Sequence, residues 1–323
     1  MKILMIGGTG IISSAVTKLC LEKGYDVFLL NRGESRKLPD GAKHIKADIR
    51  KQNEVKVLLE DHKFDSVVDW ISFTREHAEN DFELFRNRTK QFIYISSASA
   101  YLKPVKSLPV KEDFPLGNPV WEYSRNKIAG ESFLTEKRLS EDFPVTIVRP
   151  SHTYDKTKIP LPGYWTTLKR MIDGKPIIIH GDGTSLWTLT HTNDFAKGFL
   201  ALIGNESAIG ETYNITSDEY LTWDEICKTM AAAINVIPKI VHVPSDIILK
   251  YDREWGEGLL GDKAYSMIFD NTKIKSLAPE FKSEVSFEKG AKEIVMWYLE
   301  NKERQIVDIE KDKLMDFLAE KFR

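Results

Sequence analysis

The feature that most constrains this chain is a glycine-rich turn close to its first residue. Residues 2–6 form an apolar run typical of a buried strand, and the segment GGTG follows directly at residues 7–10. Residues 11–23 then carry helical spacing of apolar side chains, and Gly24 stands where a helix commonly ends. Glycines at such a junction let the backbone turn tightly and approach a pyrophosphate, while the helix presents free N–H groups to it. The junction predicts a dinucleotide-binding βα unit, in which Ser13 replaces the third glycine of the usual pattern.

Short apolar runs alternate with amphipathic stretches through the first 150 residues. The further runs lie at residues 27–30, 44–47, 66–69, 92–95 and 145–148. Strand, helix and strand repeated in this way imply right-handed crossovers and a parallel sheet. We therefore predict an α/β fold with a Rossmann-like, doubly wound parallel sheet. Such sheets bind ligands beyond the carboxyl ends of their strands, so the residues directly after each run are the candidates for function.

The second half of the chain predicts a smaller mixed α/β lobe that binds the substrate. No Pro-, Gly- or Ser-rich linker separates it, and its C-terminal part predicts two amphipathic helices within residues 286–323. A strand at residues 240–243 is expected to join the main sheet. We assign residues 1–155, with interleaved segments near 186–205 and 238–245, to the dinucleotide-binding domain. The substrate-binding lobe then comprises residues 156–185 and 206–323.

Composition and charge narrow the class of protein. The 323 residues are 42% apolar and 29% charged, which is typical of a globular chain. The net charge of −2 disfavours a general nucleic-acid or anionic-membrane binder. No run of 18 apolar residues predicts a membrane span. The two cysteines, Cys20 and Cys227, have no metal-ligand spacing, and no zinc or iron–sulfur pattern occurs elsewhere. We expect a cytoplasmic protein without a metal.

The end of the second apolar run bears on the choice of cofactor. An acidic residue there would bind the adenosine ribose hydroxyls, but the chain has Asn31 and Arg32 instead. Arg32, with Arg36 and Lys37 close behind, suits a 2′-phosphate. This pattern favours NADP over NAD. The alternative is a solvated basic loop.

A tyrosine and a lysine four residues apart predict acid–base chemistry. Tyr123 and Lys127 share one face of a helix. An ammonium group beside a phenol lowers the phenol pKa from about 10 toward neutrality, so Tyr123 suits a general acid or base. Lys127 also suits a hydrogen bond to the nicotinamide ribose. The serine-rich segment 96–101 follows the fifth apolar run, where Ser97 can bind the same substrate oxygen. Taken alone, such a Tyr–Lys pair is common on protein surfaces.

Taken in order along the chain, these motifs resemble one family. The sequence is similar to the extended (atypical) short-chain dehydrogenase/reductases, the NAD-dependent epimerase/dehydratase family. The resemblance covers most of the chain and rests on residues 7–10, 96–101, 123–127 with Glu131, 149–154, 181–183 and 191–194.

The resemblance and the strand-end positions together imply the site residues. By resemblance, the catalytic residues are Ser97, Tyr123 and Lys127, and Ser99 is a second candidate for the serine role. The cofactor-binding residues are Gly7, Gly8, Thr9, Gly10, Ile11, Ile12, Asn31, Arg32, Asp48, Ile49, Trp70, Ile71, Ser96, Tyr123, Lys127 and Pro150. The candidate substrate contacts are Ser99, His152, Tyr154, Tyr164, Trp165, Lys169 and Trp187.

The implied activity is that of an NAD(P)-dependent epimerase or carbonyl reductase. Its substrate would be a sugar or nucleotide sugar, altered at a hydroxyl or carbonyl by hydride transfer. Family 4,6-dehydratases carry Asp-Glu after the catalytic hydroxyl residue, where this chain has Ala98 and Ser99, so we disfavour dehydration. Trp187 lies in a segment where many relatives carry an arginine for the diphosphate, which counts against a nucleotide-diphosphate substrate.

An alternative reading keeps the fold without catalysis. The segments around Arg32 and Trp70 look like an atypical branch that includes chloroplast stem-loop RNA-binding proteins, several of which lack the catalytic tyrosine. A non-catalytic dinucleotide- or RNA-binding protein is therefore the second hypothesis, and Tyr123 and Lys127 argue against it. The resemblance also implies a homodimer formed through the Tyr–Lys helix.

Overall fold

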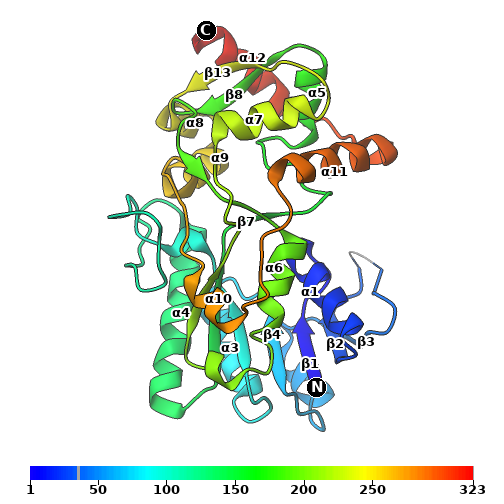
Figure 1. Cartoon of the computed structure of the whole chain (residues 1–323). Coiled ribbons are helices and arrows are strands. Elements are labelled where there is room, and N and C mark those ends of the chain that lie inside the picture. The colour runs from blue at the N-terminus through cyan, green and yellow to red at the C-terminus, as the bar shows by residue number, and fades with distance from the viewer. Residues whose placement is uncertain (35–36, 323) are drawn as a thin grey trace.

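The computed structural model describes residues 1–34 and 37–322, so Arg36 lies outside the described residues. Figure 1 shows two lobes, with the N-terminus at the base of the lower one and the C-terminal end at the top of the upper one. Within the described residues, no helix combines the length and apolarity that crossing a membrane requires.

The lower lobe is built on a seven-stranded parallel sheet. Its strand order is β11-β6-β5-β4-β1-β2-β3. The strands are β1 (Lys2–Ile6), β2 (Asp26–Asn31), β3 (Lys43–Lys46), β4 (Ser66–Asp69), β5 (Phe92–Ile95), β6 (Val145–Pro150) and β11 (Thr212–Ile215). The chain adds strands in one direction from β1 to β3 and in the opposite direction from β4 onward. This switch between β1 and β4 opens a crevice at the carboxyl ends of the two strands. The predicted Rossmann-like, doubly wound α/β fold is confirmed.

Helices cover both faces of this sheet. The helices on one face are α1 (Ile11–Glu22), α6 (Thr192–Leu200) and α10 (Thr272–Leu277), and those on the other are α2 (Gln52–Leu58), α3 (Arg75–Phe85) and α4 (Glu122–Glu141). Alternate side chains of β1 enter the two cores, Ile3 and Met5 toward α1 and α6, and Leu4 and Ile6 toward the opposite helices. All four are fully buried, as a strand with both faces covered requires.

The upper lobe has its own small sheet and helical cover. Its main elements are α5 (Trp165–Ile172), β8 (Pro176–His180), α7 (Trp223–Ala232), β13 (Lys239–Val243), α8 (Ser245–Tyr251), α9 (Arg253–Gly258), α11 (Phe287–Glu300) and α12 (Ile309–Phe322). The short strands β7 (His152–Tyr154), β9 (Leu186–Trp187), β10 (Leu189–His191) and β12 (Leu221–Thr222) pair as β7 with β10 and β9 with β12. Both predicted C-terminal helices are present as α11 and α12.

Two strand assignments from the sequence are wrong. The run at residues 240–243 does not join the main sheet, because β13 pairs in parallel with β8 inside the upper lobe. Strand β11, which we had placed in the substrate-binding lobe, forms the edge of the main sheet instead. A short apolar run shows that a strand is buried, not which neighbour buries it. Here Val241 and Val243 pack against Met315 and Leu318 of α12.

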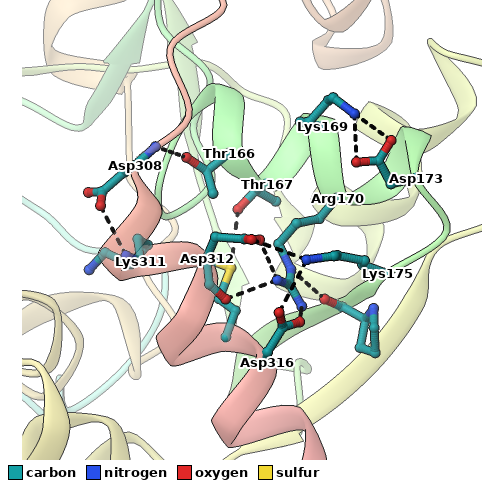
Figure 2. A network of polar contacts seen from close by, with 12 residues as sticks. Thr166, Thr167, Lys169, Arg170, Asp173, Lys175, Asp308, Lys311, Asp312 and Asp316 are labelled. Carbon is teal, nitrogen blue, oxygen red and sulfur yellow. Dashed lines mark hydrogen bonds and ion pairs between the residues drawn. The ribbon is translucent and has the colours of Figure 1, made fainter.

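Helix α12 is fastened to the upper lobe by one buried arginine (Figure 2). Arg170 of α5 is 2% exposed in its side chain and reaches Asp312 Oδ1 at 2.5 Å and Asp316 Oδ1 at 2.7 Å. Lys175 lies 3.1 Å from each of the same two carboxylates. These contacts place the start of α12, including Leu314, along the wall of the cavity between the lobes.

Candidate active site

A cavity of about 2200 Å³ lies between the two lobes. It is lined by the glycine turn, the carboxyl ends of the main-sheet strands, the first turn of α4 and one side of the upper lobe. All predicted site residues except Tyr154 and Lys169 line it. The fold therefore brings the predicted cofactor and catalytic positions, which are scattered over the first 150 residues, to a single cavity.

The glycine turn has the geometry of a backbone cradle. Gly7 and Gly8 have φ values of +95° and +77°, which only glycine adopts freely. A Cβ atom on Gly8 would lie 2.5 Å from Leu29 Cδ2. The hydroxyl of Ser13, which is 3% exposed, accepts a hydrogen bond of 2.8 Å from the Gly10 N–H, so the serine braces the turn from within. The turn leaves room for a dinucleotide and not for side chains.

The end of β2 is tied to this turn. Asn31 Nδ2 donates to the Gly7 carbonyl at 2.9 Å, and Asn31 Oδ1 accepts from the Gly33 N–H at 2.9 Å. Asn31 thus replaces the usual acidic residue with a structural link. Arg32 lies at the cavity rim with a side chain 65% exposed, and its Nε is 3.5 Å from a Glu34 carboxylate oxygen.

The next strand ends form the walls of the cofactor half. Asp48 Oδ1 accepts from the Arg50 N–H at 3.0 Å, and the Arg50 guanidinium donates across the crevice to the Ile71 carbonyl. The Trp70 ring packs 5.0 Å from the Phe199 ring, centroid to centroid. Sequence reasoning missed Arg50, although it stands only two residues after the predicted Asp48.

The predicted acid–base residue stands in the first turn of α4. Tyr123 lies beside Ser97, whose Oγ is 2.9 Å from Ser99 Oγ, and Ser99 Oγ in turn accepts from Ser124 Oγ at 2.7 Å. Burial raises the pKa of Tyr123 above its ordinary value, the Ser97 hydroxyl opposes this, and Asp262 adds to it. Ser124 completes this hydroxyl chain and was not singled out in the sequence.

Lys127 is buried beneath the tyrosine. The residue is 2% exposed. Its Nζ donates to the carbonyls of Ser72 at 2.6 Å and Ile95 at 2.7 Å. Burial lowers the Lys127 pKa to about 8, although nearby carboxylates, first among them that of Asp69, act in the opposite direction. Lys127 Nζ is 5.9 Å from the centre of the Tyr123 ring.

This geometry differs from the expected effect of lysine on tyrosine. We expected Lys127 to lower the pKa of Tyr123, whereas burial raises it. The reason is that burial disfavours the charged phenolate and outweighs the groups around it. The hydroxyl of Ser97 is the group that favours ionisation of Tyr123.

The predicted substrate contacts divide into two groups. His152 faces the cavity, and its Nδ1 accepts from Trp187 Nε1 at 3.2 Å, so the ring proton lies on Nε2. Tyr154 instead is buried in the core, with its ring 5.5 Å from that of Phe287. Lys169 lies outside the cavity and binds Asp173 at 2.5 Å. Trp165 and Tyr164 line the upper wall.

Several cavity residues had no motif to reveal them. They are Phe73, Trp121, Lys158, Trp223, Asp262 and Lys263. They come from segments far apart in the chain, and only the packing of the lobes brings them together. The substrate half of the cavity is therefore lined by aromatic rings and by the ammonium groups of two lysines.

The geometry defines a dinucleotide-binding protein with a tyrosine, a lysine and serines at the floor of its cavity, and the comparisons with known proteins agree. The sequence profile described as "NAD dependent epimerase/dehydratase family" matches residues 3–216. The chain belongs to this family, as its motifs indicated.

Individual relatives differ in their described roles. The chain is 31% identical over 256 residues, 75% of its length, to the Arabidopsis thaliana "Chloroplast stem-loop binding protein of 41 kDa b", of which the match covers 65%. It is 23% identical to a Bacillus cytotoxicus UDP-N-acetyl-alpha-D-glucosaminuronate decarboxylase, over 93% of this chain and 98% of the relative. A solved structure of UDP-glucuronic acid 4-epimerase from Bacillus cereus, in complex with UDP-glucuronic acid and NAD, superposes with a TM-score of 0.73 at 21% identity and covers 93% of this chain and 100% of that one. At this identity, the last likeness shows the fold.

Proposed function

We propose that this protein is an NAD(P)-dependent epimerase or carbonyl reductase acting on a sugar or nucleotide sugar. The observation that carries the proposal is the placement of Tyr123 and Ser97 in the same cavity as the glycine turn. A buried tyrosine braced by a serine is suited to exchange a proton with a substrate oxygen. The membership of the family and the sugar-nucleotide enzymes among its relatives support the substrate class.

The chain's own residues divide the work. Tyr123 gives a proton to the substrate oxygen or takes one from it, and Ser97 Oγ, held by Ser99, hydrogen-bonds the same oxygen. Lys127 supplies a fixed positive charge beneath them. The glycine turn fits the pyrophosphate of a nicotinamide dinucleotide, which when bound supplies or accepts the hydride. The upper lobe covers the cavity and excludes water from it.

We propose NADP as the preferred cofactor. Arg32 is the cation at the end of β2, and no carboxylate stands at residue 31 to bind the ribose hydroxyls. The exposed Arg32–Glu34 contact is weak enough to be exchanged for a 2′-phosphate. The family is described as NAD dependent, so this preference is specific to the chain's own β2 end.

We propose hydride chemistry without dehydration of the sugar. Removal of water needs groups that take a proton from carbon and protonate the leaving hydroxyl. The two positions after Ser97 are Ala98, which has no polar side chain, and Ser99, whose hydroxyl is held by Ser97 and Ser124. Neither supplies a carboxyl group.

A second candidate is binding without catalysis. It is favoured by the 31% identity to a protein named for stem-loop binding. The presence of both Tyr123 and Lys127, and a net charge of −2, favour chemistry instead. On this second reading, replacing Tyr123 would leave the protein's function intact.

We further propose a reducing, cytoplasmic setting and a homodimer. Cys20 and Cys227 are buried and unpaired, and burial raises the pKa of both thiols to about 12. Thiols of this kind are inert structural groups in a reducing compartment. The dimer rests on the resemblance alone and is tested by the mass of the protein in solution.

The test is turnover of sugars by the loaded protein. The protein is incubated with NADP or NAD and a panel of sugars, sugar acids and nucleotide sugars. Absorbance of the reduced nicotinamide reports a reductase, and NMR of the recovered sugar reports an epimerase. We expect turnover in the wild type and in Tyr220→Phe, an exposed tyrosine outside the cavity. No turnover with any sugar, together with RNA binding that survives Tyr123→Phe, would establish the second candidate.

A further inference from the structure

The substrate half of the cavity contains two lysines that form no ion pair with any residue that the structure describes. We propose that Lys158 and Lys263, beside His152, form a subsite for an oxyanion group, a carboxylate or phosphate carried by the sugar itself. This inference rests on the proposed function, because that function places the reacting carbon of the sugar at Tyr123. It adds the chemical class of substrate: an acidic or phosphorylated sugar, not a neutral one.

Lys263 lies close to the reacting end of the cavity. Its Nζ stands 5.2 Å from the centre of the Trp121 ring, and the Trp121 ring is 5.0 Å from that of Tyr123. The same Nζ is 6.0 Å from the Trp187 ring. The ammonium group therefore sits between two aromatic walls, one ring away from the predicted acid–base residue. A group bound there belongs to the part of the ligand that reacts.

The carboxylate of the residue before Lys263 in the chain is already engaged. The neighbouring residue Asp262 binds Lys103 Nζ at 3.0 Å, and the side chains of that pair are 11% and 4% exposed. Lys103 also donates to the carbonyls of Ser99 and Tyr101 at 3.2 Å, so it is fixed in place. Among the described residues, the Lys263 ammonium group has no hydrogen bond or ion pair. It makes cation–π contacts with the rings of Trp121 and Trp187.

The backbone of Lys263 is held unusually firmly. Its carbonyl accepts three hydrogen bonds, from His180 Nε2 at 3.0 Å, Trp223 Nε1 at 3.2 Å and Ser185 Oγ at 3.2 Å. Lys263 closes a π-helical turn, η3 (Leu259–Lys263), a conformation that is often found at functional sites. Three donors on one carbonyl fix the direction in which the side chain leaves the backbone. The backbone position of Lys263 is thus set in advance of binding.

Lys158 is the second lysine of the cavity lining. The nearest acidic residue along the chain, Asp155, accepts from the Thr157 N–H at 2.8 Å and the Thr157 hydroxyl at 2.6 Å. The Lys158 ammonium group has no hydrogen bond or ion pair within the described residues. Burial lowers the Lys158 pKa, the charge on Lys263 lowers it further, and Asp155 partly offsets both. The two lysines therefore repel one another across the cavity.

His152 adds a neutral donor to the same cavity. Its Nδ1 is occupied by Trp187 Nε1, which leaves an N–H on Nε2. Burial and the charges of Lys158 and Lys263 hold the His152 pKa well below its usual range, so the ring is neutral near pH 7. The three groups offer donors and no acceptor. Two mutually repelling cations with a shared donor are stabilised by an anion, and a neutral sugar offers them nothing equivalent.

Two carboxylates of the upper rim are paired with lysines of α12. Asp252 is paired with Lys311, and Glu310 is paired with Lys313 at 2.9 Å. These two carboxylates are therefore engaged by other cations.

Binding of simple sugars tests the subsite without turnover. The full chain, saturated with NADP or NAD, is titrated with glucuronate, glucose 6-phosphate and glucose. The readout is fluorescence of Trp121, Trp187 and Trp223, with saturation-transfer NMR as a second signal. We expect at least one of the two anions to bind about tenfold or more tightly than glucose, as a hydrogen bond to a charged group predicts. The tighter anion identifies the group as a carboxylate or a phosphate.

Variants assign the effect to the lysines. Lys263→Met and, separately, Lys158→Met should each weaken anion binding about tenfold and leave glucose unchanged. Lys292→Met, which removes an exposed lysine of α11 paired with Glu288, is the matched control and should change nothing. All variants should keep their affinity for the cofactor, which also shows that they are folded.

The outcomes separate this inference from the proposed function. Glucose binding as tightly as both anions, no binding of either anion, or anion binding that survives both lysine variants would overturn the subsite. If turnover of neutral sugars is then found, the proposed function stands alone. Selective anion binding that depends on the two lysines supports the subsite even where a sugar panel shows no turnover, and in that case it is the proposed function that fails.

Discussion

The two halves of the cavity are built in different ways. On the cofactor side, the critical atoms belong to the backbone of the glycine turn and to Asn31, which bonds to Gly7, 24 positions earlier in the chain. On the substrate side, the walls come from side chains that lie further apart in sequence. His180 Nε2, for example, donates to the Lys263 carbonyl across 83 positions at 3.0 Å. A backbone cradle recognises a cofactor common to many enzymes, while the side-chain wall carries the specificity of this one.

The largest effect is expected at the boundary between the halves. Tyr123→Phe removes the hydroxyl that exchanges the proton with substrate and should reduce kcat by about 10²–10⁴-fold, the usual contribution of a general acid or base. Cofactor affinity should stay near the wild-type value, because the ring still fills its place beside Trp121. The measurement is turnover of the best sugar from the panel, with cofactor binding by calorimetry on the same preparation.

Tyr220→Phe is the control for loss of a tyrosine hydroxyl as such. A Tyr123→Phe variant that keeps full turnover would mean that another group moves the proton. A variant that loses cofactor binding as well would mean that the two halves are not separable, which would break the comparison.

A second test addresses the cofactor half alone. Gly8→Ala places a Cβ atom 2.5 Å from Leu29 Cδ2 at a φ of +77°, so the turn must shift. We expect cofactor affinity to fall by roughly 30- to 100-fold, which corresponds to the cost of about 2–3 kcal/mol that strain and crowding together produce. Binding of glucuronate and glucose 6-phosphate at the substrate half should change little by comparison.

Gly24→Ala is the matched control. Gly24 has a similar φ of +73°, yet a Cβ atom there meets nothing within 4 Å. The Gly24→Ala variant, at the far end of α1, therefore measures the effect of backbone strain without crowding of the new Cβ atom. Equal losses of cofactor affinity in both variants would show that the close approach at Gly8 is not what shapes the cradle.

The same contrast explains what the sequence predicted. The first six strands of the main sheet are marked by local apolar runs, so they were found with nearly correct bounds, and the glycine turn and the Tyr–Lys pair were found by their motifs. The partner of β13 was not, because four apolar residues in a row do not say whether the main sheet or β8 with α12 will bury them. Lys158 and Lys263 carry no motif, since their role arises only when the lobes fold together. The direction of the Tyr123 pKa shift also depended on burial, which the sequence does not show.

The third test removes the ion pairs that hold α12 against α5, behind the wall of the substrate half. Arg170→Met removes the partner of Asp312 and Asp316 and should lower the free energy of unfolding by about 2 kcal/mol, because one buried cation holds two carboxylates and the Pro176 carbonyl (Figure 2). Denaturant unfolding measures it. Arg253→Met, which removes an exposed pair with Glu257, should leave the free energy of unfolding unchanged.

The pH dependence of this effect has a definite sign. Burial raises the pKa values of Asp312 and Asp316, but Arg170 and Lys175 outweigh it, so both pKa values are lowered. A lowered carboxyl pKa stabilises the fold above the unfolded value of 3.8 and ceases to do so as the pH falls through the folded value. The difference between wild type and Arg170→Met should therefore shrink below pH 3.8. A difference that grows in acid would contradict the assignment.

The smallest effect probes Arg32, the side chain of the cofactor half that we propose contacts the 2′-phosphate. Arg32→Ala should reduce affinity for NADP about tenfold, as loss of an exposed charge-assisted contact to a phosphate predicts, and leave NAD affinity unchanged. Lys18→Ala, an exposed lysine on α1 paired with Glu22, controls for loss of a nearby positive charge. If NAD already binds more tightly than NADP in the wild type, Arg32 serves the Glu34 contact and not the cofactor. The cofactor half would then be built from backbone and short-range links alone, and the contrast with the substrate half would be sharper still.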